Sequence, residues 1–140
     1  MIRKRNSFIL FILLFVLALG FTFPSKRKIV WPQKVYNKKN NPPSTEKKEL
    51  GRLLFYDPIL SSDNTISCSS CHLSYTAFTH TDHAVSHGVF DRVGKRNAPA
   101  LFNLAWKKNF MWDGAIHSLD AQAMAPIENV LEMNETLANV

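Results

Sequence analysis

The chain has 140 residues, of which 46% are hydrophobic, so it is long enough for one compact domain and too short for two full ones. Its net charge of +6 is unevenly spread, because residues 1–49 hold 11 basic and 2 acidic side chains whereas residues 50–140 hold 6 and 9. The part with domain character is therefore mildly acidic, which excludes a nucleic-acid-binding domain with a basic folded surface.

The first 23 residues have the pattern of an export signal. Basic residues within the first five positions precede an apolar run from Phe8 to Leu19, and Gly20 follows. This run is shorter than the roughly 18 to 20 residues of a comfortable membrane span, which favours a secretory signal. The sequence has no clean Ala-x-Ala cleavage site, so an uncleaved N-terminal membrane anchor stays open. Both alternatives predict a periplasmic domain.

Residues 24–44 have the composition of a flexible tether. Four prolines lie among many Lys and Asn residues, a pattern that favours an extended, solvated chain. The folded domain is predicted to cover residues 45–140. Its first helix is predicted over residues 45–56, where leucines recur at helical spacing before Asp57-Pro58 stops the helix.

The sequence of the rest of the domain predicts an all-α fold with long irregular loops. Residues 57–96 lack periodicity apart from a short helical turn at residues 68–72, and so long a loop indicates a cofactor around which it wraps. A second helix is predicted to begin after Asn97, its N-cap, and to end near Lys108. A third is predicted from Ser118 until Pro126 closes it, and a fourth begins at Asn134.

Cys68, Cys71 and His72 form the C-x-x-C-H pattern of covalent c-type haem attachment. On one helical turn both sulfurs face the same side and can form thioethers with the haem vinyl groups, while His72 lies beneath the iron as its proximal ligand. The alternatives are a disulfide or half of a zinc site. Zinc would need another ligand pair, and the sequence has no third cysteine. The pattern therefore predicts one covalently attached haem c.

The second axial ligand of the iron, which separates an electron carrier from a catalyst, is not assigned by spacing. A loop histidine is more often solvated, and a methionine at helical spacing more often belongs to the core. A mono-haem c-type electron-transfer protein with both axial positions filled is thus one function to consider. The candidate ligands are His80, His83, His87, His117, Met111, Met124 and Met133.

Five further segments occur in a characteristic order along residues 50–140. In this order they closely resemble the N-terminal, peroxidatic haem domain of bacterial di-haem cytochrome c peroxidases and their MauG-type relatives. The resemblance implies a cytochrome c-like fold and a haem enzyme that reduces hydrogen peroxide to water with electrons from a small cytochrome or cupredoxin. The segments are Leu50-Gly-Arg-Leu-Leu-Phe-Tyr-Asp-Pro, Ile66-Ser-Cys-Ser-Ser-Cys-His, Arg96-Asn-Ala-Pro, Phe110-Met-Trp-Asp-Gly and Leu131-Glu-Met-Asn.

The resemblance also implies roles for residues at the iron. His72 would be the proximal ligand, and His87 matches a distal histidine that in many members leaves the iron on activation. Gln122 and Glu132 match polar residues beside the open position. There Gln122 would hold peroxide by hydrogen bonds and Glu132 would act as general acid and base.

Two more matches concern the partner haem of the family. Trp112 matches the tryptophan between the two haems and would relay electrons, and Asn97 matches a ligand of a calcium ion near the haem pair. Ala115 departs from the family, because many relatives place an arginine there.

Only one C-x-x-C-H motif is present, so the resemblance places the second haem in a missing C-terminal domain. The chain then corresponds to the N-terminal half of a di-haem enzyme. A MauG-type oxidase acting on a protein side chain is a further alternative, since the feature that separates it lies on the second haem. A homodimer also stays open.

Overall fold

The structure is a computed structural model that describes residue 9 and residues 11–16 and 28–140. It divides into two compact units, residues 1–31 and residues 32–140. In the first unit, residues 9 and 11–16 are helical, and most of the predicted export signal lies outside the described residues. No helix within the described part of the chain is long and apolar enough to cross a membrane.

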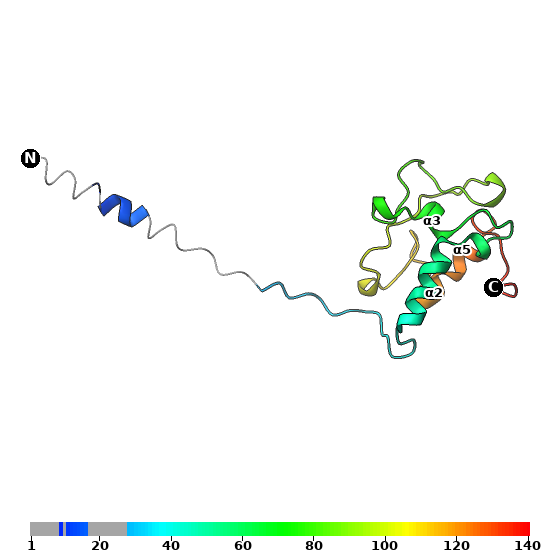
Figure 1. The fold of residues 1–140 in the computed structure, drawn as a ribbon, viewed down its shortest axis with the longest axis horizontal. Helices are drawn as coiled ribbons and strands as arrows, with labels where there is room; N and C mark the ends of the chain where they lie inside the picture. The colour runs from blue at the N-terminus through cyan, green and yellow to red at the C-terminus, as the bar shows by residue number, and fades with distance from the viewer. Residues whose placement is uncertain (1–8, 10, 17–27) are drawn as a thin grey trace, which may run out of the picture. The chain divides into compact units, whose positions relative to one another are not determined.

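The second unit begins its regular structure with helix α2 (Thr45–Tyr56), which has the predicted bounds (Figure 1). The side chain of Ser44 caps its N-terminus by accepting a hydrogen bond from the backbone N–H of Lys47, and Glu46 places a negative charge in the first turn. Asp57 ends the helix in an extended conformation, as expected of a residue before proline.

Beyond α2 the chain forms short helical elements joined by irregular loops. Residues 32–140 contain no strand, only isolated bridges that pair residues 73 with 79, 87 with 93 and 110 with 116. The fold is therefore all-α with long loops, as predicted. The elements are η1 (Pro58–Leu60), α3 (Cys68–Cys71), η2 (Ser74–Thr76), η3 (Val89–Asp91), η4 (Leu104–Trp106), α4 (Leu119–Gln122) and α5 (Met124–Glu128).

The predicted helix from Asn97 to Lys108 is wrong. Residues 97–103 are irregular, and only the single turn η4 follows. Ala98 precedes Pro99, and the proline ring disfavours a helical conformation at that position. Asn97 does not act as an N-cap, because its side-chain amide donates to the carbonyl oxygen of His80 instead.

Two other helix boundaries also differ from the prediction. Pro126 does not close a helix but is the third residue of α5, where its missing N–H costs nothing because the first turn has no intrahelical acceptors. The break falls at Ala123, between α4 and α5. No helix begins at Asn134, which has a left-handed backbone with φ of 52°.

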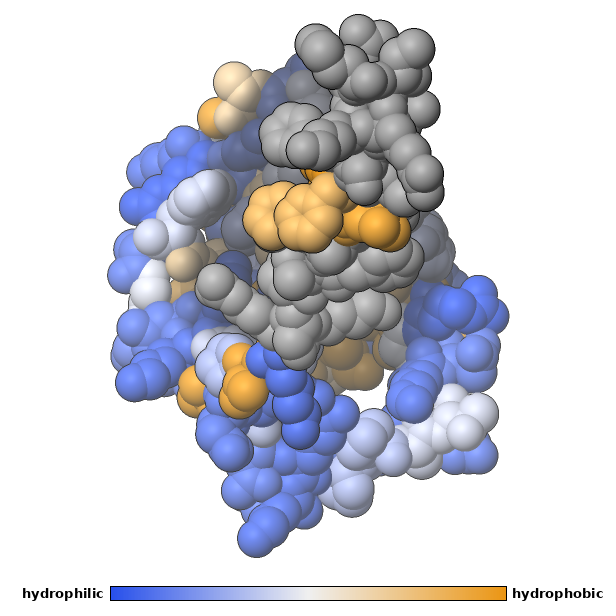
Figure 2. All heavy atoms as spheres, turned by 90° about the vertical axis from the view of Figure 1, so that its left-hand side faces the viewer, coloured by the Kyte–Doolittle hydropathy of each residue, from blue (hydrophilic) through white to orange (hydrophobic). Residues whose placement is uncertain are grey.

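The second unit combines a small apolar core with a large internal cavity. Buried apolar side chains are few, and α2 contributes none. Instead, apolar residues of α2, α3 and α5 line a hollow of about 470 Å³. In Figure 1 these three helices lie among the loops, and the coloured surface around the grey atoms in Figure 2 is mostly hydrophilic with small apolar areas.

Part of the predicted tether contacts the domain. The backbone N–H groups of Val35 and Tyr36 donate to the carbonyl oxygen of Ala105 at 2.9 and 3.0 Å. The Tyr36 hydroxyl and the Asn41 amide both donate to Oδ1 of Asp120, at 2.7 and 2.9 Å. Residues 35–41 therefore connect η4 to the first turn of α4.

The N-cap of α2 gives a test of the fold. Ser44→Ala removes the acceptor for the Lys47 N–H, so we expect the free energy of unfolding to fall by about 1 kcal/mol in chemical denaturation. Ser44→Asp keeps a capping oxygen and should retain the original stability. Equal losses for both variants would contradict the capping role.

Candidate functional site

The turn α3 presents both cysteines to the internal cavity. Ser67 and Ser70 form a capping box at its start, which fixes the entry of the chain into the turn. Both thiols are free and half-buried, and burial raises the pKa of each. Cys71 lies against the next loop, where its sulfur is 3.6 Å from the carbonyl oxygen of His87. The thiols are thus available for covalent attachment of a ligand in the cavity.

His72 follows directly as the C-cap of α3, and its ring is oriented by one strong hydrogen bond. Its Nδ1 lies 2.7 Å from the carbonyl oxygen of Phe78. A carbonyl can only accept, so Nδ1 carries the proton and Nε2 of the neutral ring has the free lone pair. Burial lowers the pKa of His72, although hydrogen bonds to the backbone of Phe78 and Pro99 act in the opposite direction. The lowered pKa favours the neutral form of the ring.

The carbonyl of Phe78 reaches His72 through an unusual loop. Ala77 and Phe78 both have left-handed backbones, with φ of 64° and 57°. This conformation costs about 1–2 kcal/mol for a residue with a Cβ. The Phe78 ring offsets part of that cost by edge-to-face contacts with Phe55 of α2, at 5.9 Å, and with Phe102, at 6.1 Å.

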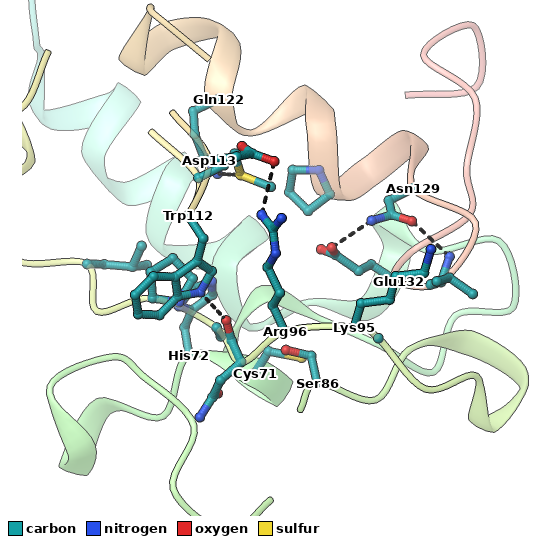
Figure 3. A pocket seen from close by; sticks show the side chains of 18 residues that line it. Cys71, His72, Ser86, Lys95, Arg96, Trp112, Asp113, Gln122, Asn129 and Glu132 are labelled. Atoms are coloured by element: carbon teal, nitrogen blue, oxygen red, sulfur yellow. Dashed lines mark hydrogen bonds and ion pairs between the residues drawn. The ribbon is translucent and has the colours of Figure 1, made fainter. Parts of the chain in front are cut away.

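Two cavities meet at His72. The first, of about 470 Å³, is lined mainly by apolar side chains of α2, α3 and α5, and the second, of about 400 Å³, is lined by more polar residues (Figure 3). Each lies within the range of roughly 300–1,000 Å³ that is typical of ligand sites. The residues that line both are Cys71, His72, Leu101, Gln122, Pro126 and Glu132.

Glu132 and Gln122 line both cavities and so lie at their boundary. They are the two polar side chains to which the family resemblance gave a role beside the iron. The Glu132 carboxylate accepts a hydrogen bond of 2.7 Å from the Asn129 amide. Burial raises the pKa of Glu132, and this hydrogen bond opposes the increase only in part. Gln122, the last residue of α4, donates to the sulfur of Met111 at 3.5 Å. A carboxyl group with a raised pKa therefore faces the same space as His72.

His87 lines the apolar cavity together with His72. Its side chain is 39% exposed, and its Nδ1 lies 3.6 Å from a carboxylate oxygen of Asp91. The His83 ring is 4.8 Å away. The described residues nevertheless contain no group of three or more His, Cys, Asp or Glu side chains arranged to hold a metal ion.

Gly88 brings the His87 loop onto the backbone of Glu132. A Cβ at this position would collide with the carbonyl oxygens of Leu131 and Glu132. The neighbouring Val89 N–H donates to the Glu132 carbonyl at 2.8 Å, and Val89 is fully buried. Glycine is therefore required here for close approach, and it ties the position of Glu132 to that of His87.

Trp112 lies on the rim of the polar cavity, as Figure 3 shows. Its ring is 64% exposed, and its Nε1 donates to the backbone carbonyl of Asn97 at 2.7 Å. The side-chain oxygen Oδ1 of Asn97 is buried without a hydrogen-bond partner. An orphaned amide oxygen suits a hard cation such as calcium, but calcium takes about six to eight oxygens. Asn97 fits as a single ligand of such an ion.

Four residues of the site carried no role in the sequence analysis. Arg96 pairs with Asp113 at 2.9 Å, and both line the polar cavity. Asn129 holds Glu132, and Phe78 holds His72 through its backbone carbonyl. Arg96 and Asp113 both lie within the motifs that carry the family resemblance, so the sequence did offer a signal for these two residues. Nothing in the sequence marked the carbonyl of Phe78, because any residue supplies one.

A helical fold with a C-x-x-C-H turn at the wall of a large internal cavity defines the class of c-type cytochromes. The family profile for di-haem cytochrome c peroxidase matches residues 45–140. The chain therefore belongs to the di-haem cytochrome c peroxidase family, whose cofactor is haem.

Relatives agree on this family. The chain is 37% identical over 106 residues to the cytochrome c551 peroxidase of Pseudomonas aeruginosa, covering 75% of this chain and 30% of that protein. It is 39% identical over 107 residues to the methylamine utilization protein MauG of Methylorubrum extorquens, covering 76% and 30%. The crystal structure of a MauG-like protein associated with microbial copper homeostasis superposes with a TM-score of 0.68 at 38% identity, covering 85% and 33%. The chain thus spans about a third of the length of these relatives.

The close approach at Gly88 gives a test of the site. Gly88→Ala should lower the free energy of unfolding by about 1–3 kcal/mol, because the added methyl group displaces the backbone of Leu131 and Glu132. Chemical denaturation measures this loss. The substitution Ala84→Ser, at an exposed position of the same loop, serves as a control. If Gly88→Ala had the stability of the wild type, the close contact at Gly88 would be refuted.

Proposed function

We propose that this chain is the peroxidatic haem domain of a di-haem cytochrome c peroxidase, which reduces hydrogen peroxide to water outside the cytoplasm. The observation that carries the proposal is the meeting of His72, Gln122 and Glu132 at the boundary of two cavities beside free Cys68 and Cys71. A haem-binding turn and a group that transfers protons are both needed for this reaction. Family membership supports it independently.

Cys68, Cys71 and His72 are the residues that hold haem c. The thiols would form the thioethers, and the hydrogen bond to the Phe78 carbonyl would leave Nε2 of His72 available to coordinate iron. The bound haem supplies the redox chemistry by which two electrons reach the peroxide. Everything else the reaction needs, namely orientation, proton transfer and exclusion of water, is supplied by the polypeptide.

Glu132 moves the proton and Gln122 orients the peroxide. Breaking the O–O bond to give water needs a proton removed from one peroxide oxygen and delivered to the other. Glu132 performs both transfers, since its raised pKa brings it closer to the working pH than an ordinary carboxyl group. Gln122 keeps its amide at the same boundary through Met111.

His87, Trp112 and Asn97 serve the activation and electron supply of the enzyme. His87, which shares a cavity with His72, would serve as a second, releasable protein ligand of the haem. The exposed ring of Trp112 would pass electrons to this domain from a second haem of the family, which a small cytochrome or cupredoxin would supply. The orphaned oxygen of Asn97 supports a role as one calcium ligand.

A second candidate is a MauG-type oxidase that modifies a protein side chain. The similarity to MauG, 39% identity, supports it as well as the similarity to the cytochrome c551 peroxidase, 37%, supports the first. Both candidates use the same haem domain and differ at the second haem. A mono-haem electron carrier is less well supported, because a carrier has no need of a polar cavity with Gln122 and Glu132 beside its haem ligand.

Haem attachment can be tested directly. Replacing both Cys68 and Cys71 with serine should abolish covalent haem in the exported protein, because no thioether can form. Haem staining after denaturing electrophoresis measures it. Ser69→Ala, between the two cysteines, should leave the stain unchanged. Covalent haem in the double variant would refute the assignment.

The acid–base role of Glu132 predicts a pH profile. Glu132→Gln should lower the rate of peroxide reduction by about 10²- to 10⁴-fold with haem content unchanged. Glu132 must be ionised to accept the first proton, so the wild-type rate falls as pH decreases through its pKa. Burial raises the pKa of Glu132, so we expect this fall in rate at a pH above the usual glutamate pKa of about 4.3. The matched control Glu128→Gln, an exposed carboxyl group at the end of α5, should retain both rate and profile.

The ligand role of His87 is tested by spectroscopy. His87→Gly should leave the iron open without activation, giving a high-spin absorption spectrum and ready cyanide binding. His83→Gly, which removes the neighbouring ring, should keep the wild-type spectrum. A low-spin spectrum unaltered by His87→Gly would exclude this residue as ligand.

A further inference from the structure

The two cavities beside His72 differ in charge. Among the residues that the structure describes, no lysine or arginine lines the apolar cavity, whereas Lys95 and Arg96 both line the polar one. Residues 50–140 contain six basic side chains in all. Two of these six are thus consecutive at one cavity, in a domain whose net charge is negative.

Of the two cysteines, Cys68 does not line the cavity that holds Lys95 and Arg96. Cys68 lines only the apolar cavity, Cys71 lines both, and Arg96 lines only the polar one. A haem c has its vinyl carbons at one edge and its ionised propionates at the other. Since the cysteines bond the vinyl edge, the propionate edge points away from them. Ionised carboxylates need either water or a cation, because their burial without a partner is costly.

We propose that Arg96, assisted by Lys95, binds the haem propionates, so that the polar cavity is the propionate end of the haem site. This inference rests on the haem attachment proposed above. A guanidinium group suits the task because its planar donors match a carboxylate in a bidentate hydrogen bond. Arg96 is 56% exposed at its side chain, which leaves the propionates near water and limits the cost of their desolvation.

Asp113 is the positioning residue for Arg96. Its carboxylate accepts from Nη1 of Arg96 at 2.9 Å and leaves the other guanidinium donors available. The Ala115 N–H, at 3.2 Å, holds the other oxygen of Asp113. Both this bond and Arg96 keep the pKa of Asp113 low. In Figure 3 Arg96 extends between Trp112 and Glu132, and Lys95 lies on the Glu132 side.

The charge of Arg96 would also influence the iron. A cation near the haem favours the reduced state, which carries one positive charge fewer, and neutralised propionates act in the same direction. Loss of Arg96 should therefore lower the reduction potential. It should also shift the propionate bending band in the resonance Raman spectrum, which responds to hydrogen bonding at these groups.

The test uses exported holoprotein in four forms: wild type, Arg96→Gln, Arg96→Lys and the double variant Arg96→Gln/Asp113→Asn. The matched control is Arg92→Gln, which removes the same charge from a side chain that lines neither cavity and donates to the Val130 carbonyl. Covalent haem content is measured first, and the potential and Raman spectrum are then recorded for each protein.

We expect Arg96→Gln and the double variant to lower the potential and shift the propionate band, Arg96→Lys to give a smaller change, and Arg92→Gln to move neither. If the double variant, whose net charge is that of the wild type, has the wild-type potential and band, Arg96 only pairs with Asp113 and the inference is overturned. If Arg96→Gln does not fold, Arg96→Lys serves as the test. A propionate band identical to that of the wild type in Arg96→Lys would also overturn the inference. Absence of covalent haem in the wild type would instead refute the proposed function, so the two failures are distinguishable.

Discussion

The hydrogen bond between Nδ1 of His72 and the carbonyl oxygen of Phe78 is the interaction on which the arrangement of the site depends. It selects the ring tautomer, fixes the direction of Nε2 and connects the α3 turn to a loop that folds back through two left-handed residues. The Phe78 ring then joins that loop to α2 and to Phe102 by aromatic contacts. One backbone carbonyl thereby connects the predicted proximal ligand to α2, a helix that also lines the cavity.

A second constraint acts on the other side of His72. The close contact of Gly88 with the backbone of Leu131 and Glu132 joins the His87 loop to the segment that carries the buried carboxyl group. Asn129 completes this segment by holding the Glu132 side chain. The proposed distal ligand and the proposed proton-transfer group therefore cannot move independently. In a reaction that begins with departure of the distal histidine, such a connection would transmit that movement to Glu132.

Local chemistry explains which helices the sequence predicted correctly. The bounds of α2 follow from Ser44, Glu46 and Asp57-Pro58, and each of these acts within a few residues. The same kind of reasoning misjudged residues 97–108 and Pro126. The Asn97 amide donates to the carbonyl oxygen of His80, which is distant in sequence, and Pro126 lies in the first turn of a new helix because the chain already breaks at Ala123. Capping residues predict a helix only where no longer-range partner competes for them.

The sequence by itself determined the family and the helical turn at Cys68–Cys71, and it predicted haem attachment there, because the C-x-x-C-H spacing needs one helical turn and the motifs follow one another along the chain. It also indicated Gln122 and Glu132, but only through resemblance. Tertiary structure alone decided that these residues meet His72 at the boundary of two cavities, that burial raises the pKa of Glu132, and that Arg96 lies with Asp113 at the polar end. Such facts depend on contacts between segments 10 to 60 residues apart, and loops without periodicity carry no local signal of where they will fold.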